Sequence, residues 1–156
     1  MRRKDREITD WAELLAIIER CSVCRVALKD EEGLYIVPLS FGYIAEGDDL
    51  RLYFHSAKEG RKVRAIGQGA EAAFEMDEEF TLVPGKTACE HGGLFGSIVG
   101  SGHIAPVEEM AAKQQALEAL MRHMTGEAWT ITPEQTEAVR VYELTVQQIS
   151  GKARRV

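Results

Sequence analysis

The chain has 156 residues, the length of one domain, and 19 basic against 25 acidic side chains give it a net charge of −6 and a pI near 5.3. An acidic balance argues against a general nucleic-acid surface, no apolar run approaches the roughly 20 residues that a membrane span needs, and the basic N-terminus lacks the apolar core of a signal peptide. We therefore expect one cytoplasmic domain over residues 1–156, with neither nucleic acid nor membrane as a partner.

The first elements are predicted as a capped helix, a strand and a turn. Asp10 starts an Asp-x-x-Glu pattern, which predicts a helix that runs to about Arg20 with one apolar stripe. Residues 23–28 favour a strand, and the acidic, glycine-ended residues 30–33 favour a turn.

The cysteines suggest a metal or redox site only weakly. Cys21 and Cys24 are spaced Cys-x-x-Cys, but Cys89 and His91 are the only residues that could complete a ligand set, and they lie in a glycine-rich segment. We expect no metal site, with Cys21 at a helix end and Cys24 inside a strand as ordinary buried thiols.

Residues 35–43 alternate between large and small side chains, the two-residue period of a strand. The large side chains are those of Tyr35, Val37, Leu39, Phe41 and Tyr43. The other face, formed by Ile36, Pro38, Ser40 and Gly42, is small and partly polar. The pattern predicts a single strand whose small face could accept a flat ligand.

Residues 50–62, LRLYFHSAKEGRK, are the most informative stretch, because strand alternation up to His55 leads directly into a polar turn. Ser56 and Glu59 form a Ser-x-x-Glu capping box, which predicts a helix over residues 57–66. Free backbone donors and the helix dipole attract anions at such a helix start. Three cations would surround it: Lys58, Arg61 and Lys62. We interpret this stretch as a phosphate cradle; the alternative is a plain cap with a solvated basic face.

The second half of the chain continues with strands and one long helix. Residues 70–76 and 97–105 predict strands, the glycine-rich residues 81–96 predict a mobile loop, and residues 139–146 predict the last strand. The intervening helix should bury Met110, Leu117, Met121 and Met124. Short strands with helices at the start, middle and end favour a mainly β (α+β) fold, an antiparallel barrel with appended helices.

Two segments carry a family resemblance: Tyr35-Ile-Val-Pro-Leu-Ser-Phe-Gly-Tyr43 and Leu52-Tyr-Phe-His-Ser-Ala-Lys-Glu-Gly-Arg-Lys62. They closely resemble the pyridoxamine 5′-phosphate oxidase-like flavoproteins, in particular the branch with the nitroimidazole-resistance (Nim) reductases, and the resemblance extends over nearly the whole chain. It implies an FMN-binding split β-barrel with flanking helices, usually a homodimer with two flavins at the interface.

The resemblance also implies roles for individual residues. His55 and Ser56 match the turn beside the flavin phosphate, and Arg61 and Lys62 match its phosphate-binding cations. The strand whose backbone lies along the isoalloxazine ring is matched by Pro38, Leu39, Ser40 and Phe41.

One segment departs from the family pattern. Ser97 matches the segment that commonly meets the partner subunit's flavin, but related proteins often carry an arginine where this chain has Gly96. The loss of that cation affects the flavin contacts expected on the dimer side.

The implied activity is that of an FMN-dependent oxidoreductase, in which a reduced nicotinamide gives hydride to the flavin and a small electron-poor substrate accepts the electrons. His55 is the candidate catalytic residue because imidazole changes charge near neutral pH; its other interpretation is a histidine that holds the turn by hydrogen bonds. FAD and a deazaflavin are alternatives to FMN.

Two other functions stay open at this point. A non-catalytic flavin-binding or storage protein would share every binding feature of the reductase. A haem-binding split-barrel protein would need an axial ligand. Its candidate ligands are His55, His91, His103 and His123.

Overall fold

The computed structural model describes residues 4–155, so the first three residues and the last residue of the expected domain lie outside the described part. An antiparallel sheet has the strand order β3-β2-β6-β8-β9-β5-β4. Its strands are β1 (Glu7–Ile8), β2 (Cys24–Asp30), β3 (Gly33–Leu39), β4 (Gly42–Glu46), β5 (Asp49–Ser56), β6 (Ala70–Asp77), β7 (Thr81–Val83), β8 (Gly92–Pro106) and β9 (Arg140–Arg154). Within the described residues the two end strands, β3 and β4, do not pair with each other, so the barrel is split.

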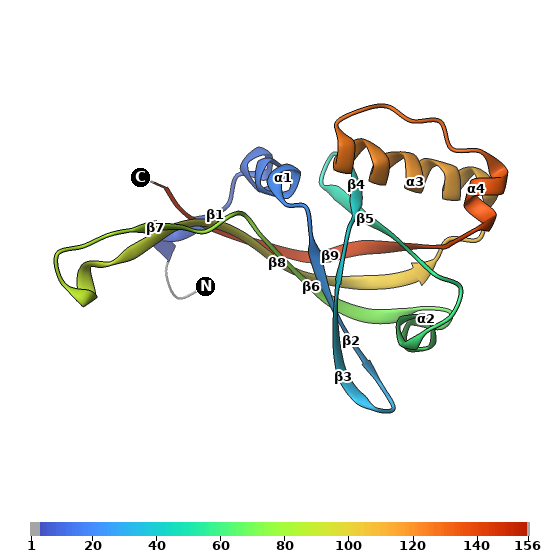
Figure 1. The fold of residues 1–156 in the computed structure, drawn as a ribbon, viewed down its shortest axis with the longest axis horizontal. Coiled ribbons are helices and arrows are strands. Elements are labelled where there is room, and N and C mark those ends of the chain that lie inside the picture. The colour runs from blue at the N-terminus through green and yellow to red at the C-terminus, as the bar shows by residue number, and fades with distance from the viewer. Residues whose placement is uncertain (1–3, 156) are drawn as a thin grey trace.

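Helices from the start, middle and end of the chain flank this sheet, and one short helical turn lies at the far tip of a hairpin, as Figure 1 shows. They are η1 (Lys4–Arg6), α1 (Trp11–Arg20), α2 (Arg61–Ile66), η2 (Ala88–Glu90), α3 (Met110–Thr125) and α4 (Pro133–Glu137). The mainly β, α+β split barrel with flanking helices is therefore confirmed. No helix in residues 4–155 is both long and apolar enough to span a bilayer.

Strand alternation builds the barrel interior. Leu50, Leu52 and Phe54 project inward from β5, and Tyr142 and Leu144 project inward from the neighbouring β9; all five are at most 2% exposed. Burying a side chain of this size stabilises the fold by about 1.5–3 kcal/mol. The residues between them on β5 and β9 therefore face outward, and this outer face carries the site described below.

The predicted strand over residues 35–43 is two strands. β3 ends at Leu39, β4 begins at Gly42, and the chain crosses between them from one end of the sheet to the other. The two predicted faces are largely confirmed, since Phe41 is fully buried while Ile36 is 66% exposed. Gly42 departs from the pattern because α3 lies directly on it: a Cβ at Gly42 would collide with the backbone of Leu120.

The helices flanking the sheet follow the prediction in part. The Asp10 carboxylate caps α1 by accepting the Glu13 N–H at 2.8 Å, as the Asp-x-x-Glu pattern predicts. Leu117 of α3 is buried as expected, but Met124 is 41% exposed. Methionine spacing near the helix end was therefore a poor guide to burial.

The predicted loop over residues 81–96 is instead a β-hairpin. β7 pairs with the first residues of β8, and Thr87 and Glu90 form a capping box around η2 at the tip. Figure 1 shows this hairpin extending away from the barrel. β8 and β9 are correspondingly longer than predicted, because their pairing continues from Pro106 back to Phe95.

Candidate functional site

The segment between β5 and α2 differs from the predicted capped helix. The Ser56 hydroxyl donates to the carbonyl oxygen of Ala57 at 2.7 Å instead of capping a helix. Gly60 is the N-cap and has φ 133°, a backbone conformation that favours glycine, and α2 begins only at Arg61. Because α2 is only six residues long and follows an irregular segment, an anion here would depend on side-chain cations and not on a helix end.

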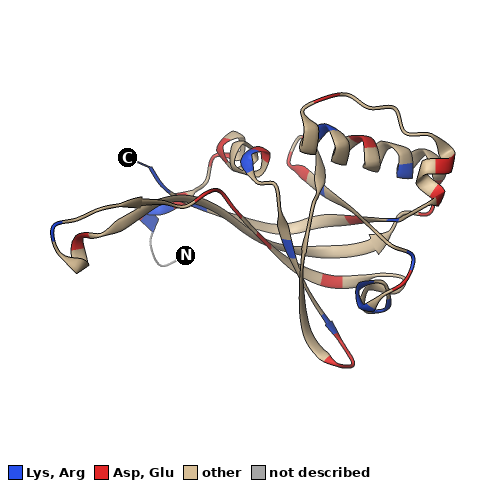
Figure 2. Ribbon diagram, in the orientation of Figure 1, with Lys and Arg blue, Asp and Glu red and all other residues tan. Residues whose placement is uncertain are grey.

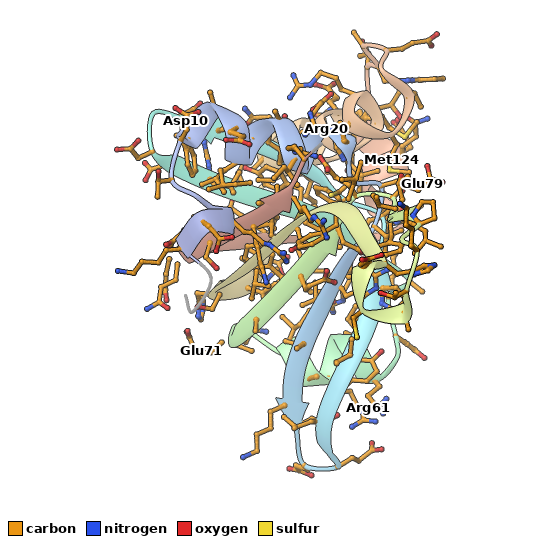
Figure 3. The ribbon with its side chains drawn as sticks, turned by 90° about the vertical axis from the view of Figure 1, so that its left-hand side faces the viewer. Asp10, Arg20, Arg61, Glu71, Glu79 and Met124 are labelled. Atoms are coloured by element: carbon orange, nitrogen blue, oxygen red, sulfur yellow. The ribbon has the colours of Figure 1, made fainter. Side chains whose placement is uncertain are left out.

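Arg61 is held by an acidic partner. Its Nε and Nη2 donate to the two carboxylate oxygens of Asp30 at 2.8 and 2.9 Å, and its guanidinium carbon lies 4.6 Å from the centre of the Tyr35 ring. The ion pair holds the pKa of Asp30 below its usual value. Figure 3 shows Arg61 beside the β2–β3 hairpin, and Figure 2 shows the cations of α2 next to the acidic tip of that hairpin. The charge of Arg61 is therefore partly neutralised by Asp30.

Lys62 and His55 have no such partner. Among the described residues, neither side chain makes a hydrogen bond or an ion pair that would offset its desolvation. Burial lowers the pKa of Lys62, and burial together with the nearby charge of Lys62 lowers the pKa of His55. An unpaired cation beside an imidazole whose protonation it disfavours marks a place where an added anion would be stabilised.

The strand register places these groups on the outer face of the barrel. His55 pairs directly with Val141 of β9, so the two side chains leave the same face of the sheet. Gly42 pairs with Tyr53, so the chain just before Gly42, which contains Ser40 and Phe41, lies beside the His55 end of β5. The Phe41 ring is buried, with its centre 4.5 Å from that of His123, so only its backbone can face a ligand.

The expected flavin-contacting residues therefore divide into two groups. His55, Ser56, Lys58, Arg61 and Lys62 come from one short segment, and Pro38, Leu39, Ser40 and Phe41 form the end of β3 and the crossing to β4 next to it. Ser97 does not join them. It lies about 30 Å along β8 from Pro106, the β8 residue nearest to the His55 end of β5.

Gly96, next to Ser97, has its side-chain space filled by another residue. A Cβ at Gly96 would collide with the carboxylate of Glu78. That carboxylate accepts from Arg20 Nε and from Arg155 Nη1, each at 2.6 Å. Burial alone would raise the pKa of Glu78, but the hydrogen bonds from Arg155 and Arg20 outweigh it and hold the pKa below its usual value. The segment thus keeps cations close by, already neutralised by a carboxylate.

A cavity of about 370 Å³ opens at Lys58, between the segment that follows β5 and the layer formed by α3 and α4. Its lining residues are Lys58, Pro106, Val107, Glu108, Lys113, Thr136, Glu137, Val139, Arg140 and Val141. Sequence reasoning missed Lys113 and Arg140, because they lie far from Lys58 in the chain and only the fold brings them to it.

Three of the four histidines already have a hydrogen-bonding partner. A ring nitrogen lies 2.9 Å from the Thr87 carbonyl in His91, 2.9 Å from the Glu71 carboxylate in His103, and 2.8 Å from the Cys21 carbonyl in His123. His55 is the one whose ring has no hydrogen-bonding partner among the described residues.

Comparisons with known proteins agree with this fold. The family model described as pyridoxamine 5′-phosphate oxidase matches residues 10–153, while no curated protein matches the chain. A solved structure from Bacteroides thetaiotaomicron, provisionally described as a 5-nitroimidazole antibiotic resistance protein, is 28% identical with a TM-score of 0.80, over 94% of this chain and 86% of that one.

Two more distant structures share the fold. The FAD and haem binding protein from Mycobacterium smegmatis is 20% identical with a TM-score of 0.81, over 97% of this chain and 74% of that one. The flavocytochrome Anf3 from Azotobacter vinelandii is also 20% identical, with a TM-score of 0.79, over 100% of this chain and 72% of that one.

Proposed function

The chain belongs to the pyridoxamine 5′-phosphate oxidase family, and from that premise we propose that it is an FMN-binding flavoprotein of the nitroreductase type. The observation that carries the proposal is the unpaired cation Lys62 beside His55 at the end of β5, neither of which has a hydrogen-bonding or ion-pair partner among the described residues. The likeness to the Bacteroides protein and to proteins described as flavin-binding supports it.

The side chains present suit the phosphate end of a flavin. Lys62 and Lys58 would hold the phosphate. Arg61 would contribute less, because Asp30 already neutralises part of its charge. The exposed backbone around Pro38 and Ser40 would lie along the isoalloxazine ring, with the buried Phe41 ring fixing that backbone from inside. Such a site orients its cofactor through a few fixed contacts on a rigid sheet.

A bound flavin would supply the redox chemistry: hydride from a reduced nicotinamide, and electrons onward to a small electron-poor acceptor. The role of His55 is to hold or release a proton beside it. Its lowered pKa keeps the ring neutral at pH 7, and a nearby anion would make protonation easier. His55 is thus the proposed catalytic residue.

We also propose a homodimer, which would bring Ser97 to the partner's flavin. A cross-strand row of mostly small side chains, here called the open face, lies on the outside of the sheet: Ile36, Ala27, Ala73, Ser101 and Gln148. Such a surface can pack flat against a second copy. The Ala73→Arg substitution should then leave a 17.4 kDa monomer in sedimentation equilibrium, whereas Ala111→Arg on α3 should not. A monomeric wild-type chain would refute the dimer.

The first test of function is the visible spectrum of the purified protein, with mass analysis of any cofactor released on unfolding. About one flavin per chain supports the proposal, and steady reduction of a nitroimidazole by NADH without oxygen separates a reductase from a storage protein. A colourless protein that also refuses added FMN and FAD contradicts it.

Haem is the second candidate, since two structures that share the fold are described as a haem-binding protein and a flavocytochrome. His55 is the candidate axial ligand because its ring has no hydrogen-bonding partner among the described residues. An unchanged Soret band on haem titration excludes this candidate. We place the protein in the cytoplasm, where its three free cysteines would stay reduced.

A further inference from the structure

We infer that the cavity at Lys58 binds an adenosine 5′-phosphate group, the adenylate part of a dinucleotide. The inference rests on the proposed flavin site and extends it. It draws on three features of the cavity: its charges, its apolar lining residues and its position beside His55.

The residues that line the cavity carry charges of both signs. Lys58, Lys113 and Arg140 supply three cations, and Glu108 and Glu137 supply two carboxylates. None of these five side chains makes an ion pair or a hydrogen bond with another described residue. Groups that converge on a cavity without pairing with one another are available to a ligand.

The mixture of charges points to a nucleotide and not to a simple anion. A free phosphate would meet the cations but would be repelled by Glu108 and Glu137. In a nucleotide, the phosphate can lie against the cations while the ribose hydroxyls donate to a carboxylate, an arrangement that dinucleotide sites use widely. Four of the lining residues, Pro106, Val107, Val139 and Val141, are apolar and offer contacts to the flat base. A cavity of about 370 Å³ is within the usual size of small-molecule sites.

The cavity is continuous with the proposed phosphate site. Val141, one of its lining residues, lies directly opposite His55 and leaves the same face of the sheet. Lys58 belongs to both, because it lines the cavity and precedes Lys62 by one short segment. A ligand with its first phosphate at Lys62 and Lys58 would therefore direct a second phosphate and its nucleoside into this cavity.

Two dinucleotides offer this chemistry. FAD would occupy both sites with one molecule, whereas with FMN at the first site the adenylate would come from the nicotinamide dinucleotide that supplies hydride. Both share the adenosine 5′-phosphate group, so AMP alone is the primary probe.

The experiment uses the full chain freed of flavin and titrated by calorimetry with AMP, FMN and FAD, and the FMN-loaded chain titrated with NADH. The double variant Lys113→Gln/Arg140→Gln removes two of the cations that line the cavity. The matched control is Lys86→Gln, an exposed lysine on the distant β7–β8 hairpin. Circular dichroism confirms that each variant folds.

AMP should bind the wild type, and the double variant should weaken AMP binding about tenfold while FMN affinity changes less than twofold. FAD binding at least tenfold tighter than FMN in the wild type, with that advantage lost in the variant, identifies FAD as the source. Equal FAD and FMN affinities, with NADH binding weakened in the variant, identify the nicotinamide dinucleotide.

No AMP binding by the wild type, or equal affinities of wild type and variant for AMP, FAD and NADH, would overturn the inference. A chain that binds neither FMN nor FAD but still binds AMP through Lys113 and Arg140 would instead refute the proposed flavin function alone.

Discussion

Arg61 holds Asp30 through two hydrogen bonds, from Nε at 2.8 Å and from Nη2 at 2.9 Å, although 31 residues separate them. This pair ties α2 to the β2–β3 hairpin. It also distinguishes Arg61 from Lys62, the next residue along, whose ammonium group has no partner in residues 4–155.

Lys62 should matter more than Arg61 for phosphate binding. Lys62→Ala should weaken binding of FMN about tenfold, because it removes a cation that no other group neutralises. Arg61→Ala should weaken it less than threefold, because Asp30 already shares that charge. Calorimetric titration with FMN and with riboflavin, which lacks the phosphate, isolates the phosphate contribution. A larger loss in Arg61→Ala than in Lys62→Ala would show that Arg61 leaves Asp30 to bind the ligand.

Flavin binding should strengthen as pH falls. Burial and Lys62 lower the pKa of His55, so the free protein holds a neutral ring at pH 7. A phosphate beside the ring favours its protonated form, so flavin binding takes up a proton. The affinity for FMN should therefore rise as the pH falls from about 8 to about 5.5. Titrations in the His55→Asn variant supply the control, since the phosphate titrates there in the same way. Identical pH profiles for the two proteins would remove His55 from the phosphate site.

The Gly96→Ala substitution should destabilise the fold by about 1–3 kcal/mol, because the added methyl group overlaps the Glu78 carboxylate. Arg20 and Arg155 hold that carboxylate from two sides, so it has little freedom to move. Urea unfolding measures the loss. In a Glu78→Ser background the same substitution should cost much less, and additive effects of the two changes would mean that the residues do not compete for this space.

One cysteine should react quickly in the native protein. Cys89 is exposed, whereas burial first, and then nearby carboxylates, raise the pKa of Cys21 to about 12, and burial strongly raises that of Cys24. A thiol reagent at about pH 8 should therefore modify one site before unfolding and three after it, located by peptide mass analysis. Fast modification of Cys21 would mean that the junction between α1 and β2 opens readily.

Local patterns predicted most of the fold. The alternation in β5 and β6 and the Asp10 cap of α1 depend on neighbouring residues, and both appear as expected. The alternation over residues 35–43 is equally regular, but it predicted one strand where the structure has two. Side chains keep alternating between the two faces through the crossing at Ser40, so the pattern does not show where β3 ends. The Ser56 capping box failed since Gly60 keeps the chain irregular up to Arg61.

The candidate site was predictable only in its contiguous part. His55 to Lys62 form one segment, so their sequence spacing carries the information. Two other features depend on which strands become neighbours. One is the ion pair of Arg61 with Asp30, and the other is the shared cavity of Lys58, Lys113 and Arg140. No local pattern in the chain records those contacts.

The central position of β9 has a consequence for the order of folding. β9 is the last strand to be synthesised, yet it lies between β8 and β5 and also pairs with β1 near the start of the chain. Until residues 140–154 emerge, β5 and β8 each keep an unpaired edge and the barrel interior stays open. Contacts between such distant segments make folding slow and concerted. A nascent chain of this protein therefore exposes unpaired, aggregation-prone strand edges until β9 is made. Its yield in the cell should depend on chaperones that bind such edges.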